Sequence, residues 1–227
     1  MSAAGKCPRQ LAYAYHGFSP NGKEMDSRAY LVFWAGDLTE MTLVALAKVA
    51  GCQITATGFG QLKVKLKIGD KEIEGHPDGL ILHESELLLL EVKSMSSYSY
   101  EKFEKGEIDG SYIAQVNLYL AALGLKRCVF VAQNKDNGVI SERIVERDDA
   151  LIEKLKTTLN IVLNSTKENL PDKPYAPNEK GILPWQCLYC KFWGTCWPEA
   201  KQVLVGTSYK LKTPIKEKEE EKVNAKA

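Results

Sequence analysis

The chain has 227 residues, of which 44% are hydrophobic and 26% charged, proportions ordinary for one medium-sized globular domain with room for a small appended module. Its formal net charge of +1 excludes a global basic field, so any binding of nucleic acid must come from local patches. The N-terminus lacks the apolar core of a signal peptide, and no run approaches the ~20 apolar residues of a membrane span. We therefore expect a cytoplasmic protein, or one in a host cytoplasm if a virus encodes it.

Two helices are expected in the N-terminal quarter of the chain. Residues 5–16 predict a short helix opened by Pro8, a residue tolerated in a first turn, and Cys7 lies at its beginning. A turn-rich loop is expected over 18–26. The next helix, over 36–50, is amphipathic, with an apolar stripe that predicts packing against a core.

The hydrophobic period changes to two in the stretch 62–68. Apolar residues alternate there with three lysines, which is the pattern of a half-buried strand. Lys63, Lys65 and Lys67 are either a ridge that contacts DNA phosphates or an ordinary solvated face that discourages edge pairing. We favour the ordinary solvated face.

The strongest chemical signal lies in two neighbouring predicted strands, 72–83 and 86–93. The second begins with four leucines, too apolar for one wet face, so we expect a central strand buried on both sides. Because side chains alternate along a strand, Glu91 and Lys93 share one face, while Asp78 on the preceding strand supplies another carboxylate. Two carboxylates and a lysine suit a hard divalent cation with a reactive water beside it. A salt-bridged hairpin is the alternative.

The segment that follows, 94–110, is polar and carries aromatic side chains. Tyr98, Tyr100 and Phe103 either stack the bases of a single strand or are exposed aromatics of a loop and short helix. Their place just beyond the end of the charged strand favours stacking.

An apolar run without glycine predicts a helix over 111–123, which places Gln115 and Tyr119 four residues apart on one face. Beyond it the pattern predicts two strands and a helix, over 128–133, 138–145 and 148–168.

Six cysteines in a reducing compartment point to metal or cluster ligation before disulfides. Cys187, Cys190 and Cys196 bring three thiolates close together in the sequence, and a closed site needs a fourth. Four-cysteine zinc sites usually use two short-spaced pairs, whereas an iron–sulfur cubane tolerates one distant ligand, so the cluster is favoured and zinc is the alternative. Cys52 and Cys128 are interpreted as buried free thiols.

The order of these motifs resembles a known nuclease superfamily, the PD-(D/E)XK nucleases, and specifically its RecB-like branch. The cysteines narrow the resemblance to the CRISPR-associated RecB-like iron–sulfur exonucleases (the fourth Cas protein) and their phage-encoded relatives. The resemblance covers roughly residues 5–200, and the segments that carry it are Cys7-Pro8-Arg9, Gly36 with Glu40, Gly75-His76-Pro77-Asp78-Gly79, Glu91-Val92-Lys93, Gln115 with Tyr119, and the three late cysteines. Members of this branch often carry a histidine where this chain has Glu40.

The resemblance implies an α/β fold, a restriction-endonuclease-like core with a central mixed β-sheet flanked by helices. It also implies a C-terminal cysteine-rich iron–sulfur module closed by an N-terminal cysteine. The expected segments are an N-terminal helix and cluster-ligand segment, the nuclease core, the iron–sulfur module and a disordered charged tail, at 1–30, 31–170, 171–207 and 208–227. Low apolar content makes disorder the expectation from Lys210 onward.

Function follows from the same resemblance. It implies a metal-dependent deoxyribonuclease, an exonuclease that hydrolyses phosphodiester bonds of single-stranded DNA or DNA ends. The setting is DNA recombination and repair or CRISPR spacer processing, with DNA and a CRISPR integrase or recombination protein as partners and no membrane. The alternative is a DNA-end-binding subunit of a larger adaptation or recombination complex, with little activity alone. A DNA-binding regulator with a decayed nuclease site is disfavoured, because the acidic and basic site residues are present.

Cofactors are assigned in the same way. Glu40, Asp78, Glu91 and the carbonyl of Val92 are expected to hold one or two catalytic Mg²⁺ or Mn²⁺ ions. A structural [4Fe-4S] cluster is expected on four cysteines: Cys7, Cys187, Cys190 and Cys196.

The remaining site residues act around the ions. Lys93 is expected to orient the attacking water or to stabilise the transition state. Gln115 and Tyr119 are expected to position the scissile phosphate or the lysine. His76 is interpreted as a surface or packing residue rather than a ligand.

Overall fold

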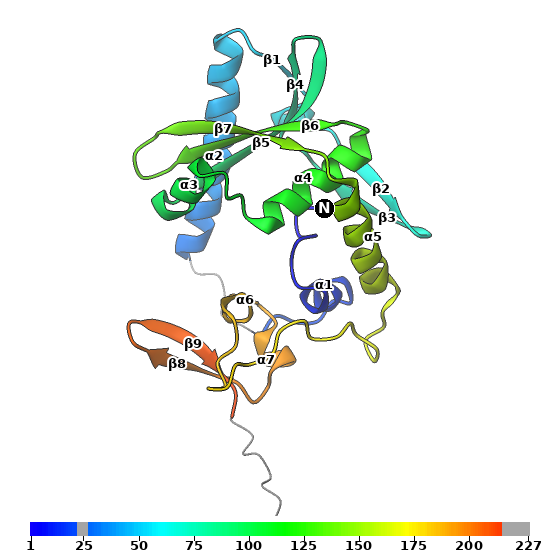
Figure 1. Ribbon diagram of the computed structural model, residues 1–227, viewed down its shortest axis with the longest axis vertical. Helices are drawn as coiled ribbons and strands as arrows, with labels where there is room; N and C mark the ends of the chain where they lie inside the picture. Colours follow the sequence, from blue (N-terminus) through cyan, green and yellow to red (C-terminus); the bar gives the residue numbers. More distant parts are fainter. Residues whose placement is uncertain (22–26, 215–227) are drawn as a thin grey trace, which may run out of the picture. The chain divides into compact units, whose positions relative to one another are not determined.

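The computed structural model describes residues 1–21 and 27–214 (Figure 1). Contacts within the chain divide it into two compact units. The first consists of Met1–His16 and Met25–Pro171, and the second of Gly17–Glu24 and Asp172–Ala227.

A five-stranded mixed sheet forms the centre of the first unit, with strand order β1-β4-β5-β6-β7. β5 and β6 run parallel, and the other neighbouring pairs run antiparallel. The expected central leucine strand is confirmed, since β5 lies between β4 and β6 and the side chains from Leu88 to Val92 are buried. The strands are β1 Gln53–Thr55, β4 Gly79–His83, β5 Glu86–Met95, β6 Arg127–Asn134 and β7 Ile140–Glu146.

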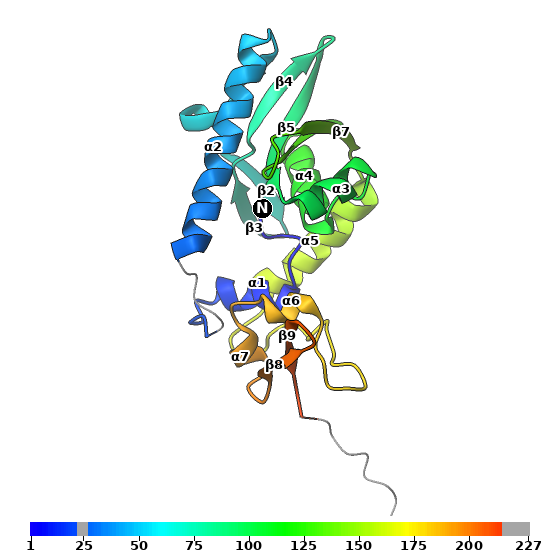
Figure 2. The same ribbon diagram turned by 90° about the vertical axis from the view of Figure 1, so that its left-hand side faces the viewer.

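Helices cover both faces of this sheet, as the expected core requires (Figures 1 and 2). One apolar cluster joins Leu89 and Phe130 of the sheet to side chains of α3 and α4, and another joins Leu90 and Val92 to α2. Successive residues of β5 therefore alternate between the two helical layers, which is why the strand is apolar on both sides. The helices of this unit are α1 Pro8–Tyr15, α2 Ser27–Val49, the 3-10 turn η1 Gly58–Gly60, α3 Ser97–Glu104, α4 Gly110–Leu123 and α5 Asp149–Asn164.

A separate two-stranded sheet pairs β2 (Val64–Ile68) with β3 (Lys71–Gly75) and packs against α4 and α5. The single strand expected over 72–83 is wrong, because the chain leaves one sheet after Gly75 and enters the other at Gly79. Pro77 lies in this break, where a residue without a backbone N–H cannot continue a ladder.

Two of the three lysines in the stretch 62–68 form ion pairs on the surface of the β2–β3 hairpin. Lys63 Nζ lies 2.7 Å from Glu74 Oε2, and Lys65 Nζ lies 3.2 Å from Glu72 Oε2. These contacts agree with the favoured interpretation of an ordinary solvated strand face.

α2 is longer than the helix expected over 36–50, since it begins at Ser27. Residues 22–26 of the expected loop lie outside the described residues. By length and composition α2 is also apolar enough to cross a membrane. The expectation that no apolar stretch of the chain approaches the length of a membrane span is therefore wrong for α2. Only Leu43 and Val44 of this helix are buried, both in its C-terminal half.

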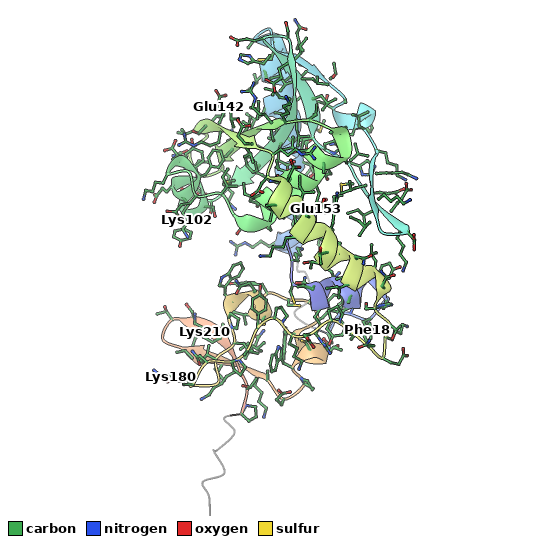
Figure 3. All side chains as sticks on the ribbon, turned by 45° about the vertical axis from the view of Figure 1, so that its right-hand side comes forward. Phe18, Lys102, Glu142, Glu153, Lys180 and Lys210 are labelled. Carbon is green, nitrogen blue, oxygen red and sulfur yellow. The ribbon has the colours of Figure 1, made fainter. Side chains whose placement is uncertain are left out.

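The aromatic residues after β5 mostly belong to the core. Tyr100 and Phe103 are buried, and the Phe103 ring centre lies 5.5 Å from that of Phe130. The expectation that they stack bases is therefore wrong for these two. Tyr98 remains exposed beside Lys102, whose Nζ lies 4.7 Å from the Tyr98 ring centre; Lys102 is labelled in Figure 3.

The second unit has a small apolar core of its own, formed by Leu183, Cys187, Ala200 and Leu211. Its elements are α6 Trp185–Leu188, α7 Trp193–Cys196, β8 Lys201–Val205 and β9 Ser208–Lys212. Disorder from Lys210 is wrong for the end of β9, because Leu211 is fully buried and holds the strand in place. Residues 215–227 of the expected tail lie outside the described residues.

The two cysteines outside the cluster motif differ from one another. Cys128 is buried in β6, as expected, whereas Cys52 is exposed at the turn between α2 and β1, so its burial was wrongly predicted.

Candidate active site

Asp78, Glu91 and Lys93 lie together where β4 begins and β5 carries its charged residues. Lys93 Nζ contacts Glu91 Oε1, lies 3.8 Å from Asp78 Oδ2, and donates a hydrogen bond to the Val92 carbonyl at 3.2 Å. Asp78 Oδ2 accepts a 2.7 Å hydrogen bond from the Val92 backbone N–H. The sequence motifs therefore meet in space, as an ion-paired cluster that is mostly hidden from solvent.

The strand register produces this meeting. Gly79 pairs with Leu90 in the antiparallel β4–β5 ladder, so the preceding residue, Asp78, falls opposite Glu91. Gly79 permits the close approach of the segment that follows β1, because a Cβ there would lie 2.7 Å from Thr57 Cγ2.

Burial changes the protonation of the two carboxyl groups. Glu91 is fully buried, and desolvation, reinforced by the charge of Asp78, raises the pKa of Glu91 to about 8. Desolvation likewise raises the pKa of Asp78. Burial works to lower the pKa of Lys93, but the Glu91 and Asp78 carboxylates outweigh it and raise that pKa.

One oxygen of Glu91 has no partner among the described residues. Oε1 accepts a 2.9 Å hydrogen bond from Gln115 Nε2 and contacts Lys93, whereas Oε2 is buried without a hydrogen bond. A buried carboxylate oxygen left in this way is costly, and a bound cation would satisfy it. Carboxylate oxygens are the ligands that hard divalent ions prefer, so Glu91 offers one suitable donor atom.

Glu40 reaches the same cluster from α2. It is half-buried, and its Oε1 accepts a 3.3 Å hydrogen bond from Gln61 Nε2. Burial first, and then the negative charge of Asp78, raises the pKa of Glu40 to about 7. Glu40 is thus close enough for its charge and that of Asp78 to interact.

Two residues that the motifs did not single out also belong to the site. Asp37 lies three residues before Glu40 on α2, and its charge raises the pKa values of both Glu40 and Asp78. Tyr112 of α4 places its ring centre 5.7 Å from Lys93 Nζ. Helical spacing carried a signal in each case, since residues three apart share a helix face.

Tyr119 and Gln115 have inward-facing positions. Tyr119 is fully buried, and its hydroxyl donates a 3.0 Å hydrogen bond to the carbonyl of His76. A Cβ on Gly75 would lie 2.6 Å from Tyr119 Cε1, so the glycine allows the contact. Gln115 is buried against Glu91, while the His76 side chain is exposed, in keeping with its interpretation as a surface residue.

The residues expected from the sequence to bind a metal ion or a cluster do not form a preassembled site. Within 1–21 and 27–214, no three or more His, Cys, Asp and Glu side chains are arranged closely enough to hold a metal ion. Cys7 belongs to the first unit, and the three late cysteines belong to the second: Cys187 in α6, Cys190 after it and Cys196 at the end of α7. Their role in a cluster stays a prediction.

No family model matches the sequence, and a search of curated proteins finds no match. Among solved structures, the chain is similar to SSO0001, with a TM-score of 0.54 and 20% identity over 84% of this chain and 81% of that one. At this identity the likeness establishes a shared fold and no more.

Two structures of an alkaline exonuclease, LHK-Exo, also match. Its complex with dAMP gives a TM-score of 0.48 and 21% identity over 71% of this chain and 88% of that one. The structure of the enzyme from Laribacter hongkongensis gives 0.46 and 19% over 70% and 87%. Likeness at this level is too low to support an argument about the present chain.

Proposed function

We propose that this protein is a metal-dependent deoxyribonuclease that removes nucleotides from single-stranded DNA or DNA ends. The observation that best supports this proposal concerns Glu91. This residue is fully buried, one of its carboxyl oxygens has no hydrogen-bond partner, and it packs beside Asp78 and Lys93. Buried charges of this kind are costly for folding and are kept where they perform chemistry.

Glu40, Asp78, Glu91 and the Val92 carbonyl would hold one or two Mg²⁺ or Mn²⁺ ions. When bound, the metal supplies a water of lowered pKa and neutralises charge that develops at phosphorus. Oxygen ligands are the ones that these hard cations prefer.

The protein's own groups prepare the site for phosphodiester hydrolysis. Lys93 carries a positive charge toward the phosphate and, through its contact with Glu91, holds that carboxylate in place. The amide of Gln115 fixes the rotamer of Glu91, and the hydroxyl of Tyr119 fixes the loop that delivers Asp78. We infer that Gln115 and Tyr119 position the carboxylates of Glu91 and Asp78, whereas the sequence suggested that they position the scissile phosphate or the lysine.

The first experiment compares wild-type protein, purified without oxygen, with Lys93→Ala on end-labelled single-stranded DNA in Mn²⁺, Mg²⁺ or EDTA. We expect cleavage that needs the cation and falls about 100- to 1000-fold in the variant, because one electrostatic group is removed. Lys65→Ala, in the exposed hairpin, is the matched control and should cleave like wild type. Equal inertness of wild type and Lys93→Ala on single strands, duplexes and flaps would reject the proposal in favour of an end-binding subunit.

A structural [4Fe-4S] cluster on Cys7, Cys187, Cys190 and Cys196 is the second part of the proposal, with zinc as the alternative. Thiolates suit both, and the trio Cys187, Cys190 and Cys196 sits on a small folded unit. Iron, sulfide and zinc analysis of protein purified without oxygen distinguishes them: four irons and four sulfides are expected per chain.

A further inference from the structure

The N-terminal half of α2 exposes three aromatic rings within five residues. Tyr30, Phe33 and Trp34 are 62%, 60% and 61% exposed, although aromatic side chains of this size usually lie inside a protein. We refer to these three residues as the aromatic stripe. Figure 2 shows α2 as one long helix, and it packs on β5 and β1.

The aromatic stripe is on the same helix as two acidic residues of the candidate active site. Phe33 and Glu40 are seven residues apart, so they lie about 20° from each other around the helix axis and about 10 Å along it. Tyr30 and Asp37 have the same spacing. A strand lying along this face of α2 would therefore pass from the rings to the carboxylates.

Other occupants explain this surface less well. A membrane-spanning α2 would place Asp37 and Glu40 in the hydrocarbon and would pull Leu43 and Val44 out of their cluster with β5, both at high cost. Protein interfaces are also rich in aromatic rings, but a protein partner does not account for the seven-residue spacing that lines Phe33 and Tyr30 up with Glu40 and Asp37. Nucleic-acid bases stack on aromatic faces whatever their sequence, and a strand stacked there would run on to these carboxylates.

We propose that the aromatic stripe stacks the bases of a single nucleic-acid strand and guides its backbone toward the candidate active site. This inference rests on the proposed nuclease function and adds to it the binding residues for substrate. Stacking on the rings, at a distance of two helical turns from Glu40, holds the nucleotides behind the scissile bond.

The test measures binding of fluorescein-labelled single-stranded oligothymidylate to full-length protein that carries Lys93→Ala, so that the probe is not cut. Adding Phe33→Ala or Trp34→Ala should weaken binding about 5- to 150-fold for each ring. Phe33→Trp, which keeps a ring, should retain affinity. Leu31→Ala is the matched control for Phe33→Ala, because Leu31 is 63% exposed and lies about 160° from Phe33 around the helix axis.

A strand of equal length in which abasic sites replace the bases separates stacking from phosphate contacts. The parent protein should bind it more weakly than oligothymidylate, and Phe33→Ala should remove most of that difference. Unchanged oligothymidylate affinity in the ring variants overturns the proposal. So does an equal loss in Leu31→Ala, or a ring-dependent association with phospholipid vesicles or with a second copy of the chain.

Hydrolysis of thymidine 5′-(p-nitrophenyl) phosphate, which has no further bases, distinguishes the two proposals. With Lys93 intact, Phe33→Ala should lose more activity on longer strands than on this small substrate, whereas Leu31→Ala should hydrolyse both like wild type. If wild type leaves both substrates uncut, the nuclease proposal fails, and the binding measurements still decide whether the stripe stacks bases.

Discussion

At the scale of single residues, Glu91 is the group whose environment departs most from that of an ordinary glutamate. It is fully buried, and its raised pKa of about 8 means that the metal-free folded protein holds a proton that the unfolded chain releases near its ordinary value. The stabilising effect of that proton is complete below the unfolded pKa and disappears as the pH rises through about 8.

We therefore expect the thermal midpoint in EDTA to fall as the pH rises from about 5 to about 8, and then to level off. Glu91→Gln keeps the shape and does not titrate, so its midpoint should fall less steeply, with a remaining slope from Glu40. Scanning fluorimetry across this pH range measures both. Glu142→Gln, at an exposed position of β7, should follow wild type, and a Glu91→Gln profile identical to wild type would contradict the raised pKa.

The sequence predicted which residues meet but not how they touch. Alternation along β5 placed Glu91 and Lys93 on one face of that strand, and helical spacing placed Gln115 and Tyr119 on one face of α4. Periodicity identifies a face and says nothing of the partner across it, so the bond from Tyr119 to the His76 carbonyl was not predictable.

At the scale of elements, β5 is the strand on which the first unit depends. Leu89 is fully buried between helices and neighbouring strands, whereas Leu87, two residues earlier, is 42% exposed. Leu89→Ala should lower the free energy of unfolding by about 2–5 kcal/mol, because it leaves a cavity in packed surroundings. Leu87→Ala should cost less than about 1 kcal/mol. Urea unfolding compares them, and equal losses would show that the strand is not central.

Element types were predictable where the hydrophobic period was long and regular, as in β5 and α4. The boundary errors have physical causes. The range 72–83 holds two short strands separated by residues 76–78, and the two halves pair in different sheets, a long-range feature that the local sequence does not specify. α2 begins at Ser27, earlier than expected, and the apolar side chains of its first half are exposed. The helix was predicted from an apolar stripe that packs against a core, and a helical segment without a buried stripe does not give that signal.

At the scale of the whole molecule, the predicted cluster would join Cys7 of the first unit to three cysteines of the second, so that metal binding would become folding free energy. Cys7→Ser and Cys187→Ala should each lose iron and lower the thermal midpoint by at least about 5 °C. Cys52→Ala, at an exposed position outside the motif, should keep both. Full iron content in Cys7→Ser would exclude the early cysteine as a ligand.

Composition and cysteine spacing indicated a core with an appended cysteine-rich part, but not the small apolar cluster that folds this part. Leu211 lies in a stretch rich in lysine, which by composition alone predicts disorder. Its burial depends on pairing with β8 and packing on Leu183, long-range contacts that local composition does not encode.

The spacing of side chains along α4 limits where this chain can gain or lose residues. Tyr112, Gln115 and Tyr119 project from it at intervals of three and four residues, and they touch Lys93, Glu91 and the loop before Asp78 in turn. Inserting or deleting one residue between them would rotate part of the helix by about 100° and separate these contacts together. Natural variants of this chain should therefore accept length changes at the hairpin tips around Gly69 and Gly206, whereas the interval from Tyr112 to Tyr119 should keep a constant length.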